Sequence, residues 1–310
     1  MLNLYRRAVL GVAGQAAVAR FARRHGWRLG ARRFVAGQDP SEALPVLGEL
    51  NASGRGVIVD VLGEYVADAA AAEAMAAAVG DTIATLAHAG IPPVVSVKPT
   101  QVGLAIDVEL AAARTLSLAL QAEAAGGKLA LDMEDARYVD ATLALLERTW
   151  QGGARRASSV LQAYLLRTPT DLEAMLAAAP DPTRLELRLV KGAYVERPEL
   201  VLSDTSAIRR AFRDLTERAL LAGAQVNVAT HDERLIAETA AFARGAGLSR
   251  DKLEYQLLYG IKPRLQRALV EAGHSVRIYV PVGRDWYGYF SRRLAERPAN
   301  LGLVLRGLFG

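Results

Sequence analysis

The stretch Val57-Ile58-Val59-Asp60-Val61-Leu62 has the length and the β-branched content of a buried strand. Seven further runs of this kind follow it at intervals along the chain. Their apolar residues are largely continuous rather than alternating, which is typical of strands that are covered on both faces. We therefore expect strands at residues 57–62, 94–98, 128–132, 159–164, 185–191, 225–230, 253–258 and 276–280.

The segments between these runs are rich in Ala, Leu and Glu and have helical periodicity, for example at residues 67–89, 105–125 and 208–222. Eight strands that alternate with helices over about 220 residues predict a parallel (β/α)8 barrel, the TIM-barrel fold. We expect an N-terminal helical segment at residues 1–54 and a catalytic barrel at residues 55–310. The sequence shows no linker, low-complexity tract or second domain.

The composition excludes several classes of protein and of site. A hydrophobic content of 51% supplies material for a core, and a charged content of 23% argues against disorder. The absence of cysteine excludes disulfides, thiolate nucleophiles and cysteine-ligated zinc. Four His, at positions 25, 88, 231 and 274, lack the spacing of metal ligands, so we expect no metal site.

The net charge of +5 is unevenly placed along the chain. Eight Arg precede Asp39, which is the first acidic residue. Such a start resembles a transit or signal peptide, but Gly11 and Gly14 break the apolar run early. A basic amphipathic helix is the preferred interpretation, either lying against an anionic membrane or docked on the barrel. Nucleic acid is not expected as a partner, because the basic excess and the aromatic residues lie at opposite ends of the chain.

Polar side chains occur at or near the end of almost every predicted strand. In a (β/α)8 barrel the active site lies at these carboxyl ends, so their accumulation predicts a site. The residues are Glu64, Lys98, Asp132, Gln162, Arg188, Lys191, Thr230, His231, Gln256 and Tyr279.

A helix after the last predicted strand carries an unusual polar face. Tyr289, Arg292, Arg293 and Glu296 have the spacing i, i+3, i+4 and i+7, which places them on one side of a helix. Two adjacent guanidinium groups can bind one carboxylate in planar geometry. The alternative is a solvated helix face. We expect this helix to lie over the mouth of the barrel.

The strand-end residues leave more than one chemistry open. No dinucleotide fingerprint and no Walker A motif is present. The glycine turn at residues 188–194 is suited to a phosphate or an anionic flavin, since Gly192 lets the backbone approach a ligand closely. The acids of residues 132–135 would suit magnesium, although the neighbouring strands offer few further carboxylates. Lys98 and Lys191 would also permit a Schiff-base aldolase.

Five motifs, in order along the chain, resemble those of the proline dehydrogenase family. The resemblance extends over residues 64–300, whereas the residues before Asp39 contribute little to it. The motifs are R-L-V-K-G-A-Y at 188–194, A-T-H at 229–231, E-Y-Q-L-L-Y-G at 254–260, R-I-Y-V-P-V-G at 277–283, and Tyr289-x-x-Arg292-Arg293-x-x-Glu296-x-x-x-Asn300.

The resemblance implies a flavoenzyme on a distorted (β/α)8 barrel that oxidises L-proline to Δ1-pyrroline-5-carboxylate. This reaction is the first step of proline degradation to glutamate. FAD would lie over strands four to six, accept a hydride from ring C5 at flavin N5 and pass electrons to a quinone. The chain stops too soon to include a pyrroline-5-carboxylate dehydrogenase, which would be a separate protein. The expected location is the cytoplasm, with peripheral contact at the inner face of the membrane left open.

The resemblance also implies roles for individual residues. Lys98, Arg292 and Arg293 would bind the substrate carboxylate. Arg188 would contact the flavin near N5, and Asp132 would orient Lys98, so these two form the catalytic pair. Tyr279, Tyr289 and Leu257 would pack the proline ring, and Glu64 would pair with Arg292 as a gate. The implied FAD contacts are Met133, Gln162, Arg188, Val190, Lys191, Gly192, Ala193, Tyr194, Thr230, His231, Gln256 and Leu257.

Overall fold

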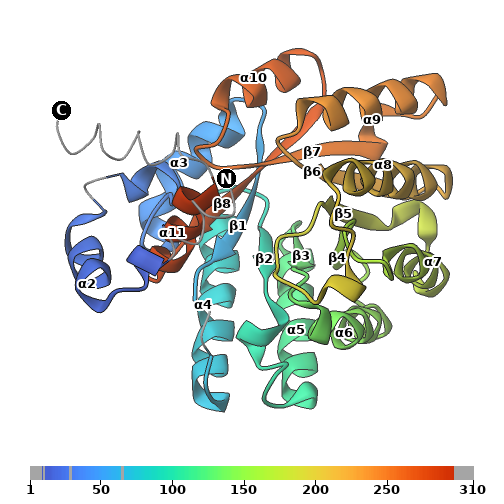
Figure 1. Ribbon diagram of the computed structural model, residues 1–310. Helices are drawn as coiled ribbons and strands as arrows, with labels where there is room; N and C mark the ends of the chain where they lie inside the picture. The colour runs from blue at the N-terminus through green and yellow to red at the C-terminus, as the bar shows by residue number, and fades with distance from the viewer. Residues whose placement is uncertain (1–8, 10, 28–29, 64–65, 297–310) are drawn as a thin grey trace.

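A computed structural model describes residues 9, 11–27, 30–63 and 66–296, and in it eight parallel strands close into a barrel (Figure 1). Each strand pairs with its neighbours in chain order, and β8 pairs with β1. The predicted barrel is therefore confirmed. The strands are β1 Gly56–Val61, β2 Val94–Val97, β3 Lys128–Leu131, β4 Ser158–Gln162, β5 Glu186–Val190, β6 Gln225–Ala229, β7 Leu253–Leu258 and β8 Ser275–Val282.

Several of the helices that cover the barrel begin at an Asp cap. Asp68, Asp107 and Asp204 each accept a hydrogen bond from a backbone N–H of the first turn, which satisfies groups that lack a partner at a helix start. The helices are α2 Ala16–His25, α3 Pro40–Ala52, α4 Ala69–His88, α5 Val108–Ala124, α6 Val139–Gln151, α7 Thr168–Ala178, α8 Thr205–Leu221, α9 Glu233–Gly245, α10 Pro263–Glu271 and α11 Trp286–Glu296.

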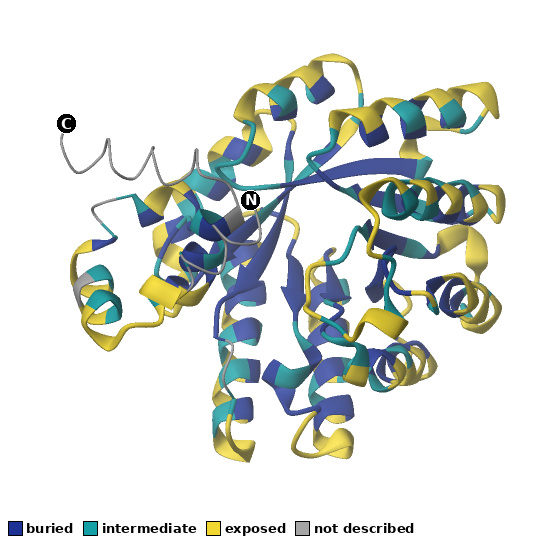
Figure 2. Ribbon diagram, in the orientation of Figure 1, coloured by how far each residue is buried: buried dark blue, intermediate teal, exposed yellow. Residues whose placement is uncertain are grey.

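The main hydrophobic core lies between the strands and the surrounding helices (Figure 2). Side chains alternate along a strand, so every second residue faces this core. Val59, Val95 and Leu129 belong to it and are fully buried. The intervening residues face the barrel interior, and this is where the polar groups lie.

The barrel interior contains two groups of charged residues separated by a thin apolar layer. Ile58, Val94 and Ala130 pack together at mid-height. Toward the carboxyl ends of the strands lies what we term the mouth cluster, consisting of Asp60, Ser96, Lys98, Asp132, Arg188 and Tyr279. Toward the amino ends lies the floor cluster, consisting of Lys128, Glu186, Glu254 and Arg277.

The N-terminal segment packs on the barrel and on α11. Ala43, Leu47 and Leu50 of α3 are part of the main core. Farther toward the N-terminus, the rings of Trp27 and Trp286 lie 6.0 Å apart between their centroids. The described part of this segment therefore docks on the protein, one of the two alternatives for it, while membrane contact stays a prediction.

Among the described helices, α4 alone is long and apolar enough, by length and composition, to cross a membrane. It has 20 residues and a mean hydropathy of 1.2. Val79, Ile83 and Leu86 on one side of it pack into the main core. This packing is that of a barrel helix, so its composition is weak support for a membrane span.

Candidate active site

Asp132 is the centre of the mouth cluster. It follows the last residue of β3, and its carboxylate accepts hydrogen bonds from Ser96 Oγ (2.5 Å), Arg188 Nη1 (2.7 Å) and the Tyr279 hydroxyl (2.7 Å). Lys98 Nζ lies 3.5 Å from Asp132 Oδ2. Donors from β2, β5 and β8 and from the residue after β2 thus converge on one carboxylate, which fixes the relative positions of two cations and a phenol.

Asp60 is a second acid of this cluster, and the sequence interpretation missed it. Its Oδ1 accepts a hydrogen bond from Lys98 Nζ at 3.2 Å, and the residue is 2% exposed. It is the one acid within an otherwise apolar strand, a signal that could have identified it. Buried carboxylates are rare unless paired, so a single Asp in such a run indicates a partner inside the barrel.

Burial and the two cations move the pKa values of these two acids in opposite directions. Burial raises the pKa of Asp60 above its ordinary value, although the Lys98 ammonium opposes the rise. Burial acts in the same direction on Asp132, but the charges of Lys98 and Arg188 outweigh it and hold that pKa below its ordinary value. Asp132 therefore remains ionised and anchors the cations.

Two buried polar atoms near the mouth cluster have no hydrogen-bond partner within the described part of the chain. They are Arg188 Nε, within the cluster, and Gln256 Oε1, whose amide Nε2 donates to Glu254 Oε1 of the floor cluster at 2.8 Å. Arg188 also lies over the ring of Tyr279, with 5.3 Å from its Cζ to the ring centroid. Buried polar groups are normally hydrogen-bonded, so a donor and an acceptor left over indicate a ligand at this place.

The structure places three predicted strand-end residues deeper than the sequence suggested. Arg188, Gln256 and Tyr279 lie within β5, β7 and β8 rather than at their carboxyl ends. Lys98, Asp132 and Lys191 directly follow strands, as expected. Because β8 is longer than predicted, Tyr279 reaches the centre of the cluster from inside the barrel.

The turn after β5 contains the predicted glycine, and the structure gives two requirements for it. Gly192 has a φ of 112°, and a Cβ there would lie 2.1 Å from a ring carbon of Tyr164. The glycine is therefore required by the packed Tyr164 ring as well as by the backbone. Beyond it, Ala193 is exposed and Tyr194 is 38% exposed, so this turn presents atoms to solvent.

Asp232 binds two cations beside the mouth cluster, and the sequence interpretation missed this residue as well. Its Oδ2 accepts hydrogen bonds from Lys191 Nζ (2.6 Å) and Arg209 Nε (2.8 Å). Burial would raise its pKa, but these two cations lower it to about 2. Its backbone N–H donates to Thr230 Oγ1 at 3.1 Å. The carboxylate thus holds two cations beside the end of β6.

The remaining residues implied for FAD lie around the same rim. His231 Nε2 accepts a hydrogen bond from the backbone N–H of Leu258 at 3.1 Å, so that nitrogen carries no proton. Gln162 is buried, and its side-chain amide donates to the backbone oxygen of Glu134 at 2.8 Å. Met133 and Val190 pack in one hydrophobic cluster beside them.

The predicted role of Leu257 is wrong, since its side chain faces the other way. Leu257 is 1% exposed and belongs to the core between the strands and the helices. Gln256 and Leu258, on either side of it in β7, alternate with it toward the interior. Leu258 is half-buried there, so it is the leucine of this strand that can contact a ligand in the barrel.

The helix α11 follows the carboxyl end of β8. Tyr289 is buried in an aromatic cluster with Trp286 and Phe290, and the Arg293 guanidinium lies over its ring at 5.0 Å. Arg292 and Arg293 are half-buried. Tyr289 and Arg293 therefore share a helix face, as predicted, but Tyr289 is fixed by packing. The predicted gate residue Glu64 lies outside the described residues, as does Asn300.

The structure argues against both alternative chemistries. The acids of residues 132–135 diverge, since Asp132 turns into the barrel, Glu134 binds Thr100, and Asp135 binds Arg137. No three His, Asp or Glu side chains within the described ranges gather as metal ligands would. Lys98 and Lys191 are both held in ion pairs with carboxylates rather than directed at an open position where a carbonyl carbon could be attacked.

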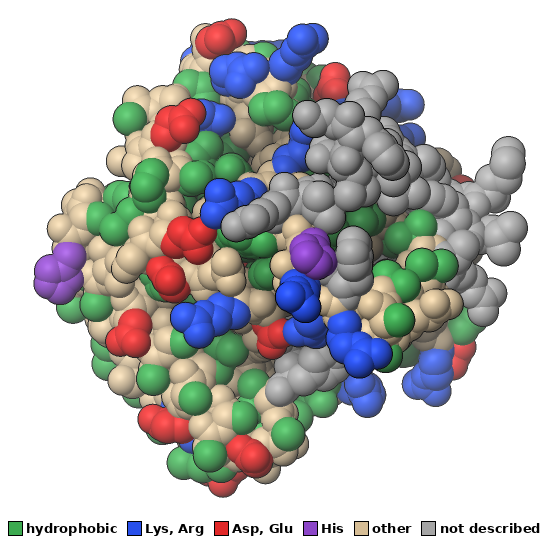
Figure 3. Space-filling view, turned by 90° about the vertical axis from the view of Figure 1, so that its left-hand side faces the viewer, with side chains coloured by type: hydrophobic (Ala, Val, Ile, Leu, Met, Phe, Trp, Pro, Cys, Tyr) green, Lys and Arg blue, Asp and Glu red, His purple; other side chains and the backbone are tan. Residues whose placement is uncertain are grey.

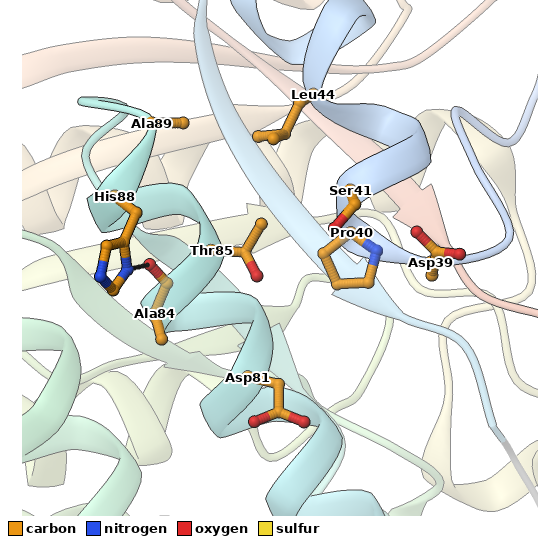
Figure 4. Close-up of a pocket in the computed structure, with 9 residues that line it drawn as sticks. All are labelled: Asp39, Pro40, Ser41, Leu44, Asp81, Ala84, Thr85, His88 and Ala89. Atoms are coloured by element: carbon orange, nitrogen blue, oxygen red, sulfur yellow. Dashed lines mark hydrogen bonds between the residues drawn. The ribbon is translucent and has the colours of Figure 1, made fainter.

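A shallow groove between α3 and α4 lies on the outside of the barrel (Figure 4). Its volume is about 830 Å³. Two of the polar groups along it serve local structure, since Asp39 caps α3 and His88 Nδ1 lies 2.8 Å from the Ala84 carbonyl oxygen. The groove has no connection with the mouth cluster, so we assign no site to it.

A closed (β/α)8 barrel with a buried charged cluster at the carboxyl ends of its strands is the arrangement of a barrel enzyme. Comparison with known proteins identifies its class of reaction. The model of the family described as proline dehydrogenase matches residues 43–306. The chain therefore belongs to the proline dehydrogenase family and is an oxidoreductase that acts on proline in the first step of proline catabolism.

Individual relatives agree with this assignment. The chain is 40% identical to the proline dehydrogenase of Deinococcus radiodurans, with 99% of this chain and 98% of the relative covered. It is 36% identical to proline dehydrogenase 2 of Bacillus subtilis (strain 168), with 93% of each chain covered. The solved proline utilization A of Bdellovibrio bacteriovorus matches with a TM-score of 0.79 at 23% identity. That match covers 85% of this chain and 32% of the other, and it shows the fold alone.

Proposed function

We propose that the protein oxidises L-proline to Δ1-pyrroline-5-carboxylate with non-covalently bound FAD and delivers the electrons to a quinone. The mouth cluster carries this proposal. Arg188 is held in place by Asp132 through Nη1, while its buried Nε has no partner within the described residues. A buried donor that is held in place in this way can donate a hydrogen bond to a bound ligand.

The residues around the mouth fit a bound flavin. Arg188 Nε would donate to the isoalloxazine ring, and the Gln256 Oε1 acceptor would receive a hydrogen bond from it. Lys191 and Arg209, both held by Asp232, would face the pyrophosphate. Figure 3 shows Lys and Arg side chains gathered with a His on the side that carries α2 and α11. When bound, FAD supplies the hydride acceptor, N5.

The attachment is proposed to be non-covalent because no Cys or His in the described part of the chain is placed for a tether. The chain contains no cysteine, and His231 Nε2 already accepts a backbone hydrogen bond. Purified protein should be yellow, and denaturation should release intact flavin into the supernatant. A colourless protein that fails to take up added FAD would contradict this part of the proposal.

The substrate is proposed to lie between the mouth cluster and α11. Arg292, Arg293 and Lys98 would bind its carboxylate, while Tyr279 and Leu258 would contact its apolar ring. Tyr279 is oriented by its hydrogen bond to Asp132, and Lys98 is oriented by Asp60 and Asp132. Fixed positions of this kind serve hydride transfer, because the reacting carbon must be held close to its acceptor.

Delivery of electrons to a quinone is proposed because no nicotinamide-binding motif is present in the sequence. Reduced enzyme should be reoxidised faster by a soluble quinone analogue than by NAD or oxygen. Rapid reoxidation by NAD would overturn this step. It would leave proline oxidation itself intact.

The remaining parts of the proposal concern location and pathway. We place the enzyme in the cytoplasm, at the inner face of the membrane, because the basic residues Arg20, Arg23 and Arg24 lie in a helix docked beside α11. A separate dehydrogenase would consume the pyrroline carboxylate. Salt-sensitive binding to anionic vesicles, weakened when these three arginines are replaced by Gln, would support the location. Equal binding by the variant would contradict it.

A further inference from the structure

A second cavity opens at the end of the barrel opposite the mouth cluster. It has a volume of about 540 Å³, within the range of small-molecule sites. It lies among the ends of α6 and α7 and the amino ends of β4 to β7, away from α2 and α11 (Figure 1). Its lining includes Trp150, Arg155, Arg156, Asp181, Arg184, Glu186, Asp251 and Lys252. No step of proline oxidation uses these residues.

Two of the four cations in the lining differ from the others in their contacts. Within the described residues, the guanidinium groups of Arg155 and Arg184 take part in no hydrogen bond or ion pair, although the Arg184 charge contributes to lowering the pKa of Asp181. The other two are fixed to the backbone. Arg156 Nη1 donates to the Gly126 oxygen at 3.2 Å, and Lys252 Nζ donates to the oxygens of Thr183 (2.8 Å) and Gly223 (2.7 Å). The cavity therefore combines two rigid cations with two guanidinium groups that can reorient.

The three acids of the lining already have donors. Asp181 Oδ1 accepts from both the backbone N–H (3.0 Å) and the hydroxyl (2.7 Å) of Thr183. Asp251 accepts from the Ser249 hydroxyl, and Glu186 is paired with Lys128 of the floor cluster. Glu186 is neutralised by Lys128, whereas Asp181 and Asp251 keep their negative charges because their donors are neutral. With Arg155, Arg156, Arg184 and Lys252, the lining therefore carries an excess of positive charge.

We propose that this cavity binds a small soluble anion of the phosphate class. Guanidinium groups match phosphate oxygens in bidentate geometry, and two arginines on neighbouring loops can bind one dianion from two sides. The recess admits a compact group. The site is independent of the flavin and proline contacts, which lie at the other end of the strands.

The test uses the FAD-loaded enzyme, so that the flavin site cannot take up the probe. Inorganic phosphate and pyrophosphate are titrated by calorimetry at constant ionic strength, and Tm is measured in parallel. The test variant is Arg155→Gln/Arg184→Gln. The matched control is Arg148→Gln/Arg213→Gln, which removes two charges from helix surfaces outside the cavity, where both arginines pair with acids.

Saturable binding by the wild type and the control, weakened at least tenfold in the test variant, is the expected result. Tm should rise with pyrophosphate in the same two proteins, because a ligand that binds only the folded state stabilises it. Proline activity should be equal in all three. Absence of saturable binding in the wild type would overturn the proposal. So would equal binding by the test variant, which would show that the probe binds elsewhere.

Discussion

The mouth cluster and the floor cluster have the same number of acids and cations, but they differ in whether all their buried polar groups have hydrogen-bond partners. Each contains two acids and two cations inside one barrel. In the floor cluster, Lys128 pairs with Glu186, and Arg277 donates to Glu254 at 2.9 Å and to the Val57 oxygen at 3.0 Å. None of these four side chains has a buried atom without a partner within the described residues.

The mouth cluster is uneven by comparison. Asp132 collects four donors, Asp60 has one, and Arg188 retains a buried Nε without a partner within the described chain. Burial and charge count alone do not distinguish a structural cluster from a functional one. The difference lies in whether hydrogen bonding is complete, since a protein that binds a ligand must leave some groups for it.

The largest expected effect concerns the stability of the floor cluster. Glu254→Gln should lower the free energy of unfolding by about 3–5 kcal/mol, because it leaves the Arg277 charge buried without its counter-ion. Denaturant unfolding of the purified variant measures this loss. KM for proline should be close to that of the wild type, since no residue of the floor cluster is proposed to bind the substrate. FAD content is measured alongside, because Gln256 donates to Glu254 Oε1 at 2.8 Å.

A double variant provides the control. Glu254→Leu/Arg277→Met removes both charges together, and replacement of a buried pair by apolar residues is often neutral. The double variant should therefore be more stable than Glu254→Gln. If it is the less stable of the two, the floor cluster contributes more than charge pairing, and the comparison fails.

The next effect should appear in catalysis. Asp132→Asn keeps the shape of the side chain and one carbonyl acceptor, but it removes the charge that fixes Arg188 and Lys98. Misplacement of such groups reduces rates on the order of hundredfold, so kcat/KM for proline should fall by about that factor. The loss in unfolding free energy should be smaller than for Glu254→Gln. Unchanged kcat/KM together with a large loss of stability would make the mouth cluster structural as well.

The sequence predicted the barrel well because its signals are local. Runs of apolar residues and helical stretches with Asp caps depend on neighbours in the chain, and each predicted strand lies within a few residues of the observed one. Lys98 and Asp132 were identified because they follow such runs directly. Helical spacing singled out the residues of α11 but left a solvated face open, and the family resemblance assigned them to substrate binding.

The sequence could not supply side-chain direction or partners across the barrel. Leu257 and Leu258 are adjacent and chemically equal, and a shift of one residue moves a side chain to the other face of a strand. Asp60 and Asp232 have no recognisable motif, because their roles depend on Lys98, Lys191 and Arg209, which come from other elements. Such contacts between distant residues are visible only in the folded structure.

The arginines of α11 extend the comparison from the mouth cluster to the substrate. If Arg292 and Arg293 bind the proline carboxylate, loss of either contact costs about 1.5–3 kcal/mol, or roughly ten- to hundredfold in binding. Arg292→Met and Arg293→Met should each raise KM by this factor with little change in FAD content. Lys should substitute poorly, because an ammonium lacks the planar fork.

Arg284→Met is the matched control for α11. Arg284 is exposed just before the helix begins, so its replacement should leave KM unchanged. An unchanged KM in both Arg292→Met and Arg293→Met would mean that this face is solvated and binds no carboxylate. The flavin part of the proposal would then stand without this substrate site.

The smallest effect is the pH dependence of stability, which should have opposite signs in the two clusters. The pKa of Glu254 is below its ordinary value of 4.5, since the attraction of Arg277 outweighs the effect of burial, which would raise it. The folded state thus binds this proton less tightly than the unfolded state. Its stabilisation is fully present above pH 4.5 and is lost as the pH falls through the folded-state pKa.

Asp60 should behave in the opposite way, because burial raises its pKa above the ordinary value of 3.8. The folded state then binds the proton more tightly, and this contribution to stability is present below pH 3.8 and lost as the pH rises through the folded-state pKa.

Asp60→Asn should therefore gain stability relative to the wild type as the pH rises above 3.8, until the Asp60 carboxyl of the folded wild type is ionised. Glu254→Gln should lose stability relative to the wild type as the pH rises toward 4.5. Unfolding free energies of the three proteins between about pH 3 and 7 measure both slopes, because this interval spans the ordinary carboxyl pKa values. Slopes of the same sign would mean that folding shifts the pKa values of Asp60 and Glu254 in the same direction, which would contradict the prediction.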